Sequence, residues 1–148
     1  MSLRLTNTLG GQLEEFRPLQ DGQVGMYSCG PTVYGPAHIG NFRAFVFADL
    51  VHRYLQWSGY RVTWVMNITD VDDRIIRDLT AGGAPSLDDL TGPHIERFLA
   101  DMASLRIGPP DVMPRATQHV PEMAALIARL LEAGHEAMRK KIEPSSVR

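Results

Sequence analysis

The stretch CGPTVYGPAHIGN, residues 29–41, stands between two regular patterns. A short apolar run, Val24 to Tyr27, leads into it, and a helical pattern leaves it from about Phe42 to Ser58. The stretch is therefore predicted to be a glycine- and proline-rich turn between a buried strand and the first turn of a helix. An open α/β sheet binds nucleotides at such a turn, because free N–H groups and the positive end of the helix dipole both favour phosphate.

Three side chains of this turn suit a phosphate group. His38 donates from both ring nitrogens when it is protonated, and Asn41 offers an amide three residues later. This spacing brings both side chains to one face of the first helical turn, and Thr32 adds a hydroxyl on the opposite side. The pattern alone fits a phosphate site, and it equally fits a tight turn with a helix cap and a solvated His38.

A second strand is expected from Tyr60 to Asn67, where β-branched and aromatic residues predominate. A strand, a helix and a strand over this length form a right-handed unit with parallel strands. Both strand ends, Cys29 and Asn67-Ile68-Thr69, then open onto the same edge of the sheet, so they are expected to lie close together despite roughly 40 intervening residues.

Further elements are expected on both sides of this unit. A weakly alternating pattern predicts a hairpin, and helical spacing predicts three more helices. Their ranges are 3–8 and 13–16 for the hairpin, and 71–79, 86–105 and 120–133 for the helices. The helix after Gly40 carries an apolar stripe that is expected to face the core. The stripe contains Phe42, Phe45, Val46, Leu50, Tyr54 and Trp57.

Helix boundaries are predicted from capping residues and prolines. Thr69 or Asp70 is expected to cap the helix at 71–79, and Thr117 the last helix. Gly92-Pro93 is expected to interrupt the helix at 86–105, with Thr91 capping a fresh start.

An acidic cluster, Asp70, Asp72 and Asp73, stands at the start of the second helix. The helix dipole favours acids in a first turn, so capping together with a solvated face is the preferred interpretation. A Mg²⁺ site is the alternative, although Mg²⁺ bound with ATP needs only one or two protein carboxylates.

Bulk properties predict one soluble domain over residues 1–135 and a basic, disordered tail over residues 136–148. Apolar residues make up 44% of the chain and charged residues 22%, and no apolar run approaches a membrane span of roughly 20 residues. The single cysteine and the absence of a signal-like N-terminus favour a reducing, cytoplasmic location. The net charge of −2 argues against a broad electrostatic surface for RNA.

Three motifs in fixed order resemble the cysteinyl-tRNA synthetase family of class I aminoacyl-tRNA synthetases. The first combines CGPTVY at residues 29–34 with HIGN at 38–41, which resembles the HIGH signature with Asn41 in place of its final His. The others are NITDVDDRII at residues 67–76 and PRATQH at 114–119. The resemblance implies an α/β fold, namely the first half of a Rossmann-like (HUP-type) catalytic domain in which helices flank a parallel sheet.

The resemblance also implies a reaction and its residues. Members of the family activate cysteine with ATP and Mg²⁺ and transfer it to tRNA-Cys. It assigns His38 and Asn41 to the triphosphate and its transition-state charge, with Thr32 in support. Gly40 would let the adenosine lie close to the backbone.

Cys29, Gly30 and Thr69 are the expected contacts of the cysteine substrate. For Thr69, a contact to the substrate amino group and a helix cap both remain open. His119, in the third motif, is expected to be structural in preference to catalytic.

The resemblance makes Cys29 a ligand of a zinc ion that also takes the substrate thiolate. Such a site needs about three protein ligands when one position stays open for substrate. The single cysteine and five histidines offer no suitable spacing, so the other ligands are expected beyond residue 148. Within the chain, an unligated thiol at a strand end is the alternative.

A KMSKS-like loop and an anticodon-reading region are not found, which predicts a truncated synthetase that cannot charge tRNA alone. Two other functions remain open: a related ligase that joins cysteine to a small-molecule amine, and a non-catalytic nucleotide-binding module. The oligomeric state is not predicted, although an uncovered sheet edge could self-associate.

Overall fold

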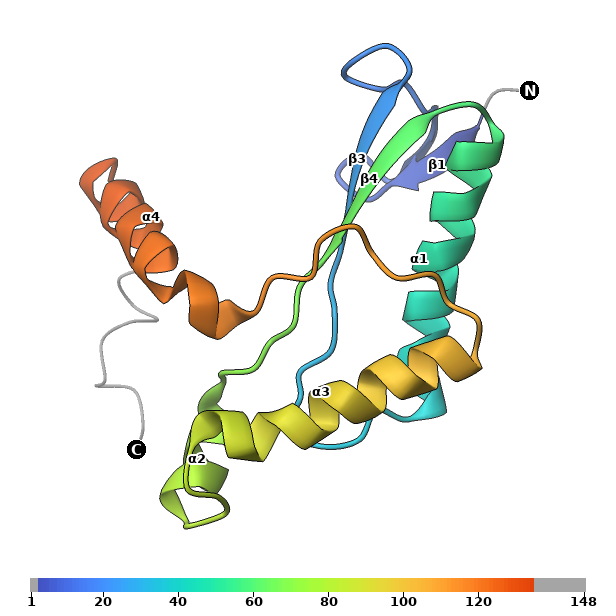
Figure 1. The fold of residues 1–148 in the computed structure, drawn as a ribbon. Coiled ribbons are helices and arrows are strands. Elements are labelled where there is room, and N and C mark those ends of the chain that lie inside the picture. Colours follow the sequence, from blue (N-terminus) through green and yellow to red (C-terminus); the bar gives the residue numbers. More distant parts are fainter. Residues whose placement is uncertain (1–2, 135–148) are drawn as a thin grey trace.

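The computed structural model describes residues 3–134, so the predicted tail at 136–148 lies outside the described part (Figure 1). The regular elements follow the predicted order. They are β1 (Arg4–Asn7), β2 (Gln12–Glu15), β3 (Gln23–Ser28), α1 (Ile39–Trp57), β4 (Arg61–Met66), α2 (Asp73–Thr80), α3 (Leu87–Ser104), the 3₁₀ helix η1 (Ala116–His119) and α4 (Val120–Glu132). The hairpin prediction is confirmed, because β1 and β2 pair antiparallel from Arg4↔Glu15 to Asn7↔Gln12.

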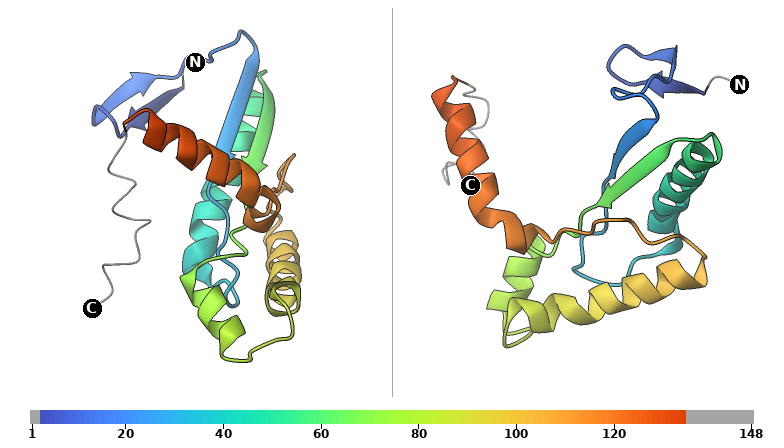
Figure 2. Two further views of the ribbon diagram at one scale, coloured as in Figure 1. Left: turned by 90° about the vertical axis from the view of Figure 1, so that its left-hand side faces the viewer. Right: turned by 45° about the horizontal axis from the view of Figure 1, so that its top comes forward.

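The central unit is β3, α1 and β4, as the sequence predicts. The two strands pair in parallel from Gln23↔Arg61 to Ser28↔Met66. Alternate residues point to α1, because successive side chains of a strand face opposite sides of the sheet. Trp64 and Met66 have no exposed surface on that side. Figure 2 shows α1 running alongside β4, with the other face of the sheet open.

A third extended segment joins the sheet at the other edge of β4. The Met66 N–H donates to the Val112 carbonyl at 3.0 Å, and the Ile68 N–H donates to the Pro114 carbonyl at 2.8 Å. The bridges that result are parallel. The sequence predicts a loop at residues 108–114, extended at each residue before a proline, and a short strand or a helix entry at 115–117. The sheet with α1 on one face is a partial Rossmann-like α/β fold.

Aromatic rings from α1 and α3 form the main core over β4. Phe98 stacks on Phe42 with ring centroids 5.7 Å apart, and it meets Phe45 edge-on at 5.1 Å. Buried aromatic rings contribute through both their apolar area and these ring contacts. The cluster joins α1, which follows the first motif, to α3, which lies beyond the second motif and α2.

The apolar stripe predicted on α1 is only partly buried. Of its members, Phe42 and Phe45 are buried, whereas Leu50 and Trp57 are 60% and 79% exposed; the buried Leu55 lies outside the predicted stripe. The helix covers the sheet with one side, so the outer part of the predicted stripe faces solvent. Helix α4 likewise contains no buried residue, and it projects away from the sheet in Figure 1.

Several predicted helix boundaries are wrong. Helix α2 is capped by Asp72, whose Oδ1 accepts from the Ile75 N–H at 2.7 Å, and neither Thr69 nor Asp70 caps it. Helix α4 begins without a side-chain cap, because the Thr117 side chain bonds to Asp70 instead.

Helix α3 is continuous through Pro93 rather than interrupted. Its cap is Ser86, whose Oγ accepts from the Asp89 N–H at 3.1 Å. The Thr91 hydroxyl donates to the Leu87 carbonyl at 2.9 Å, within the same helix. A proline removes one helical hydrogen bond, and the packing of Ile95 and Phe98 maintains the helix beyond it.

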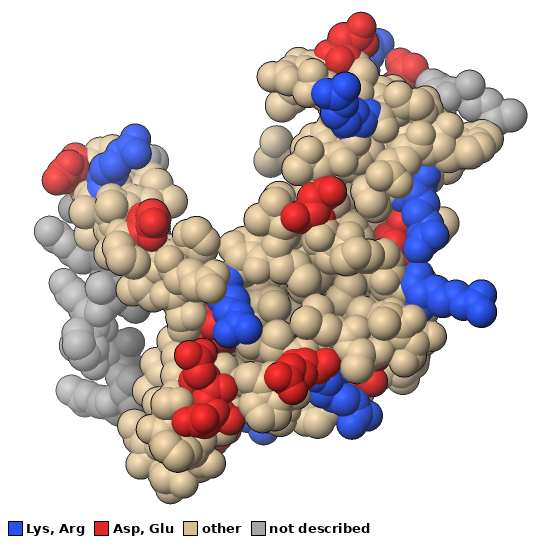
Figure 3. Space-filling view, viewed as in Figure 1, with Lys and Arg blue, Asp and Glu red and all other residues tan. Residues whose placement is uncertain are grey.

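Two surface observations complete the fold. Within residues 3–134, none of the helices has the length and apolar character needed to span a bilayer. On the face drawn in Figure 3, the Arg side chains of the described residues are scattered rather than gathered into one patch.

Candidate functional site

The first and second motifs meet at the carboxyl edge of the sheet. The Val33 N–H donates to the Thr69 carbonyl at 3.1 Å, and the Thr69 N–H donates to the Pro31 carbonyl at 2.9 Å. These bonds continue the pairing of β3 and β4 past the regular strands. The prediction that the two motifs lie side by side is confirmed.

His38 and Asn41 form a reciprocal cap at the start of α1. The His38 Nδ1 accepts from the Gly40 N–H at 3.1 Å, and the His38 N–H donates to the Asn41 Oδ1 at 3.0 Å. His38 and Asn41 therefore cap the helix, as one of the two interpretations predicts. Both side chains can still bind phosphate. In the neutral imidazole that accepts at Nδ1, the proton resides on Nε2, so Nε2 remains a donor. Asn41 keeps its Nδ2 as a second donor.

A cavity of about 220 Å³ opens beside this cap. Thr32, His38 and Asn41 all line it, and the remaining lining residues are Gly30, Pro31, Tyr34, Gly35, Pro36, Ala37 and Phe45. The three predicted phosphate-binding side chains are thus brought to one hollow at a helix N-terminus, where the dipole favours an anion.

Gly40 has a local reason to lack a side chain. A Cβ at this position would lie 2.9 Å from the His38 Cε1 and 3.0 Å from the His38 Nδ1. A larger residue would therefore push the imidazole out of its capping position.

An arginine that the sequence analysis did not single out lies near the cavity. The Arg74 guanidinium stands 4.1 Å from the centre of the Tyr34 ring, a cation–π contact that ties α2 to the first motif. Tyr34 lines the cavity, whose lining residues carry no lysine or arginine of their own. No spacing rule links residues 34 and 74, so this contact could not be predicted.

Cys29 is exposed at the end of β3, and its thiol makes only a weak 3.6 Å contact to the Gly30 carbonyl. Among residues 3–134, no three His, Cys, Asp or Glu side chains lie close enough to hold a metal ion. The described residues therefore supply one thiol and do not by themselves fit a zinc site.

Gly30 and Thr69 both form hydrogen bonds with Asn67, a residue to which the sequence assigned no role. A Cβ on Gly30 would lie 1.7 Å from the Asn67 carbonyl oxygen, so the two strand ends touch backbone to backbone. The Asn67 side chain binds both neighbours: Oδ1 accepts from the Gly30 N–H at 3.1 Å, and Nδ2 donates to the Thr69 Oγ1 at 3.0 Å. The helix-cap interpretation of Thr69 is wrong.

The acidic cluster is largely committed to structural bonds. Both oxygens of Asp70 accept from Thr117, and Asp72 caps α2. Asp73 remains exposed in the first turn of α2. Capping rather than metal binding thus accounts for Asp72, as preferred from the sequence. His119 ends η1 and makes no side-chain cap bond to α4.

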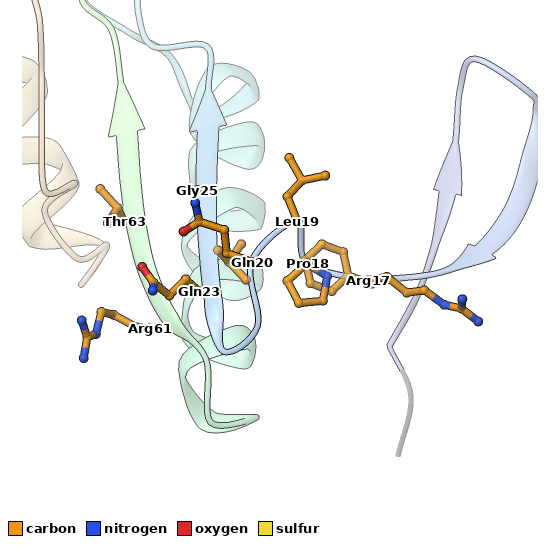
Figure 4. Close-up of a pocket in the computed structure, with 10 residues that line it drawn as sticks. Arg17, Pro18, Leu19, Gln20, Gln23, Gly25, Arg61 and Thr63 are labelled. Atoms are coloured by element: carbon orange, nitrogen blue, oxygen red, sulfur yellow. The ribbon is translucent and has the colours of Figure 1, made fainter.

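A larger hollow of about 530 Å³ lies elsewhere, at the amino ends of β3 and β4. Figure 4 shows its side chains on the sheet face opposite α1, with Gln23, Arg61 and Thr63 on the strands and Pro18 and Leu19 on the preceding loop. Ligands of open α/β sheets bind outside the carboxyl ends of the strands, so the smaller cavity is the better candidate.

Comparison with known proteins agrees with this geometry. Residues 15–143 match the family described as tRNA synthetases class I (C) catalytic domain. The cysteine–tRNA ligase of Serratia proteamaculans is 49% identical over 133 residues, which cover 90% of this chain and 29% of that protein. The cysteine–tRNA ligase of Koribacter versatilis is 47% identical over 130 residues, covering 88% and 26%.

The cysteine–tRNA ligase of Pyrococcus horikoshii is 44% identical over 135 residues, which cover 91% of this chain and 28% of that protein. The chain therefore spans between a quarter and three tenths of the length of these relatives. With the family match extending over most of its residues, the chain belongs to the class I tRNA synthetase catalytic domains of the cysteine type.

Proposed function

We propose that this chain provides the ATP- and cysteine-binding edge of a cysteine–tRNA ligase. In the proposed reaction the carboxylate of cysteine attacks the α-phosphate of ATP, pyrophosphate leaves, and the cysteinyl group then passes to tRNA-Cys. The observation that carries the proposal is one edge of the sheet that holds the cavity of Thr32, His38 and Asn41 next to Cys29 and Thr69. The proposed setting is the cytoplasm.

The ATP end of the proposed site consists of donors at a helix N-terminus. His38 Nε2, Asn41 Nδ2 and the Thr32 hydroxyl would donate to phosphate oxygens, and their fixed positions would stabilise charge that develops as pyrophosphate leaves. Mg²⁺ would arrive with ATP and keep most of its waters. Because none of the described residues that line the cavity is a lysine or an arginine, we expect weak ATP affinity from this chain alone.

The cysteine end of the proposed site comprises Cys29, Gly30 and Thr69. Thr69 has a hydroxyl at the edge, half-buried, and Cys29 has an exposed thiol. As a zinc ligand, Cys29 would need partners outside the described residues, so no step of the reaction is assigned to zinc here. Soft sulfur is the ligand chemistry that zinc accepts, which is why Cys29 remains the proposed metal contact.

A nucleotide-binding module is the second candidate function. It is favoured by one observation: the phosphate cavity is formed entirely by residues 30–45, whereas the described residues supply a single candidate zinc ligand. A ligase that uses a small-molecule amine would share the same first half-reaction. The TVY run at residues 32–34 and the NITDVDD box at 67–73 favour the tRNA enzyme over it.

Calorimetric titration of the 148-residue chain with ATP·Mg²⁺ and with a non-hydrolysable cysteinyl-adenylate analogue tests the proposal. We expect the analogue to bind at least tenfold more tightly than ATP, because it fills both ends of the site. Equal affinity for ATP and the analogue would support the nucleotide module. Failure to bind either ligand would refute both functions.

Pyrophosphate exchange addresses catalysis separately. We expect little or no cysteine-dependent exchange by this chain, since the described residues of the cavity supply no lysine or arginine to the phosphates. Robust exchange would show that the 148 residues suffice for activation and would overturn that expectation.

A further inference from the structure

Asn67 makes three side-chain hydrogen bonds at the junction of the two motifs. Its Oδ1 accepts from the Gly30 N–H at 3.1 Å and from the Tyr27 hydroxyl at 2.8 Å, and its Nδ2 donates to the Thr69 Oγ1 at 3.0 Å. The bonds to Tyr27 and Gly30 reach across 40 and 37 residues of sequence. One carboxamide therefore connects the end of β3, the first motif and the second motif.

The orientation of this carboxamide follows from chemistry. A backbone N–H can only donate, so the atom facing Gly30 must be the oxygen of Asn67. The nitrogen then faces Thr69 and can only donate to it. The Thr69 hydroxyl consequently accepts from Asn67, and its own hydrogen is left to point away from that bond.

Backbone contact reinforces the same junction. The Asn67 carbonyl oxygen leaves no room for a side chain on Gly30, since a Cβ there would lie 1.7 Å away. Cys29 lies one residue before Gly30. Its position thus depends on both the backbone and the side chain of Asn67.

We propose that Asn67 is a positioning residue for the amino-acid end of the site, which sets the distance between Cys29 and Thr69 and the direction of the Thr69 hydroxyl. This inference rests on the proposed function for its biological meaning. The positioning itself is a property of the free protein and can be measured without any ligand.

The first experiment is NMR of the isotope-labelled 148-residue chain, comparing Asn67→Ala and Asn67→Asp with the parent. In Asn67→Ala the Gly30 amide loses its acceptor, so its hydrogen exchange should rise roughly five- to tenfold. Asn67→Asp keeps an oxygen for Gly30 but has no N–H for Thr69, so Gly30 exchange should stay unchanged while the Thr69 methyl signal shifts.

A residue with only a general stabilising role would not separate Gly30 from Thr69 in this way. Asn7→Asp is the matched control, because Asn7 also makes side-chain bonds, to Glu14 and Leu9 in the outer hairpin, far along the chain from the edge. If Asn67→Ala does not fold, the Gly30 exchange rate and the Thr69 methyl signal of Asn67→Asp still test the proposal. Unchanged Thr69 signals in Asn67→Asp would overturn the proposal.

The second experiment is a double-mutant cycle on binding of the cysteinyl-adenylate analogue, using Asn67→Ala, Thr69→Val and both together. If Asn67 acts through Thr69, its substitution should weaken analogue binding several-fold in the parent and much less in the Thr69→Val background. ATP affinity should change less than twofold in every variant.

The outcomes of the two experiments separate the two proposals. Additive effects of the two substitutions, or equal losses for ATP and the analogue, would contradict positioning by Asn67. A parent chain that binds neither ligand would refute the proposed function. The NMR comparison, which needs no ligand, would then test the positioning role by itself.

Discussion

Asp70 holds Thr117 with both of its carboxylate oxygens. Oδ1 accepts from the Thr117 N–H at 2.9 Å, and Oδ2 accepts from the Thr117 hydroxyl at 2.6 Å. Asp70 is only 1% exposed, so the pair is a buried, charge-assisted link between the second and third motifs. It also keeps the segment that joins the far edge of β4 in place.

Replacing Asp70 by Ala should therefore lower the free energy of unfolding by about 2–4 kcal/mol, because both donors of the half-buried Thr117 lose their partner. Urea denaturation followed by circular dichroism measures the loss. Asp73→Ala is the control, since Asp73 is exposed on α2 and should change stability far less. Equal losses of unfolding free energy in the two variants would show that the Asp70–Thr117 bonds do not stabilise the fold.

Gly30→Ala should destabilise the chain by at least 2 kcal/mol, because the new Cβ would overlap the Asn67 carbonyl oxygen and force the strand ends apart. The matched variant is Gly25→Ala in β3, the strand that leads into the first motif, where a Cβ would meet nothing within 4 Å. Thermal unfolding should show a lowered Tm for the first variant alone. Similar melting of both variants would contradict the close approach at Gly30.

Asn41 offers a way to separate capping from phosphate binding. Asn41→Asp keeps an oxygen for the His38 N–H and adds a negative charge at a helix N-terminus, so stability should be held or slightly raised. The same change removes the Nδ2 donor and repels phosphate, so ATP binding should fall at least tenfold. Thermal unfolding and calorimetry measure the two effects.

Asn41→Ala should lose both properties, with about 1 kcal/mol of stability removed along with the cap. If Asn41→Asp bound ATP as well as the parent, the Asn41 side chain would not be a phosphate contact.

The 148-residue chain should hold well below one zinc ion per molecule after purification with zinc and dialysis. The physical reason is that Cys29 has no second or third ligand among residues 3–134. Elemental analysis of the parent and of Cys29→Ser should give the same low value. A stoichiometric zinc content that Cys29→Ser removes would show that this chain completes a metal site.

Local patterns in the sequence were enough to predict the strand–helix–strand unit, its parallel pairing and the meeting of the first two motifs at one edge. The helix after the HIGN motif, its end at about Ser58 and the antiparallel hairpin also follow from local patterns, because hydrophobic periodicity and turn residues act within a few positions. The motifs at residues 29–41, 67–76 and 114–119 were sufficient to point to the family.

Other features depend on partners that are distant along the chain. Thr117 resembles a helix cap in sequence, yet Asp70, 47 residues away, takes its hydroxyl. The prolines near Val112 predict a loop, yet the open edge of β4 accepts that segment. On α1, periodicity marks an apolar stripe, but which part of it is buried depends on where the sheet and α3 lie.

Asn67 shows the same division at the candidate site. The sequence by itself predicted that Asn67 ends a strand, two residues before Thr69. Only the tertiary structure decided that its carboxamide binds Tyr27 on the neighbouring strand and Gly30 just beyond the end of that strand. The reason is physical: helix and strand patterns are set by residues near each other in the chain, whereas a side-chain hydrogen bond depends on which strands are brought within about 3 Å of it.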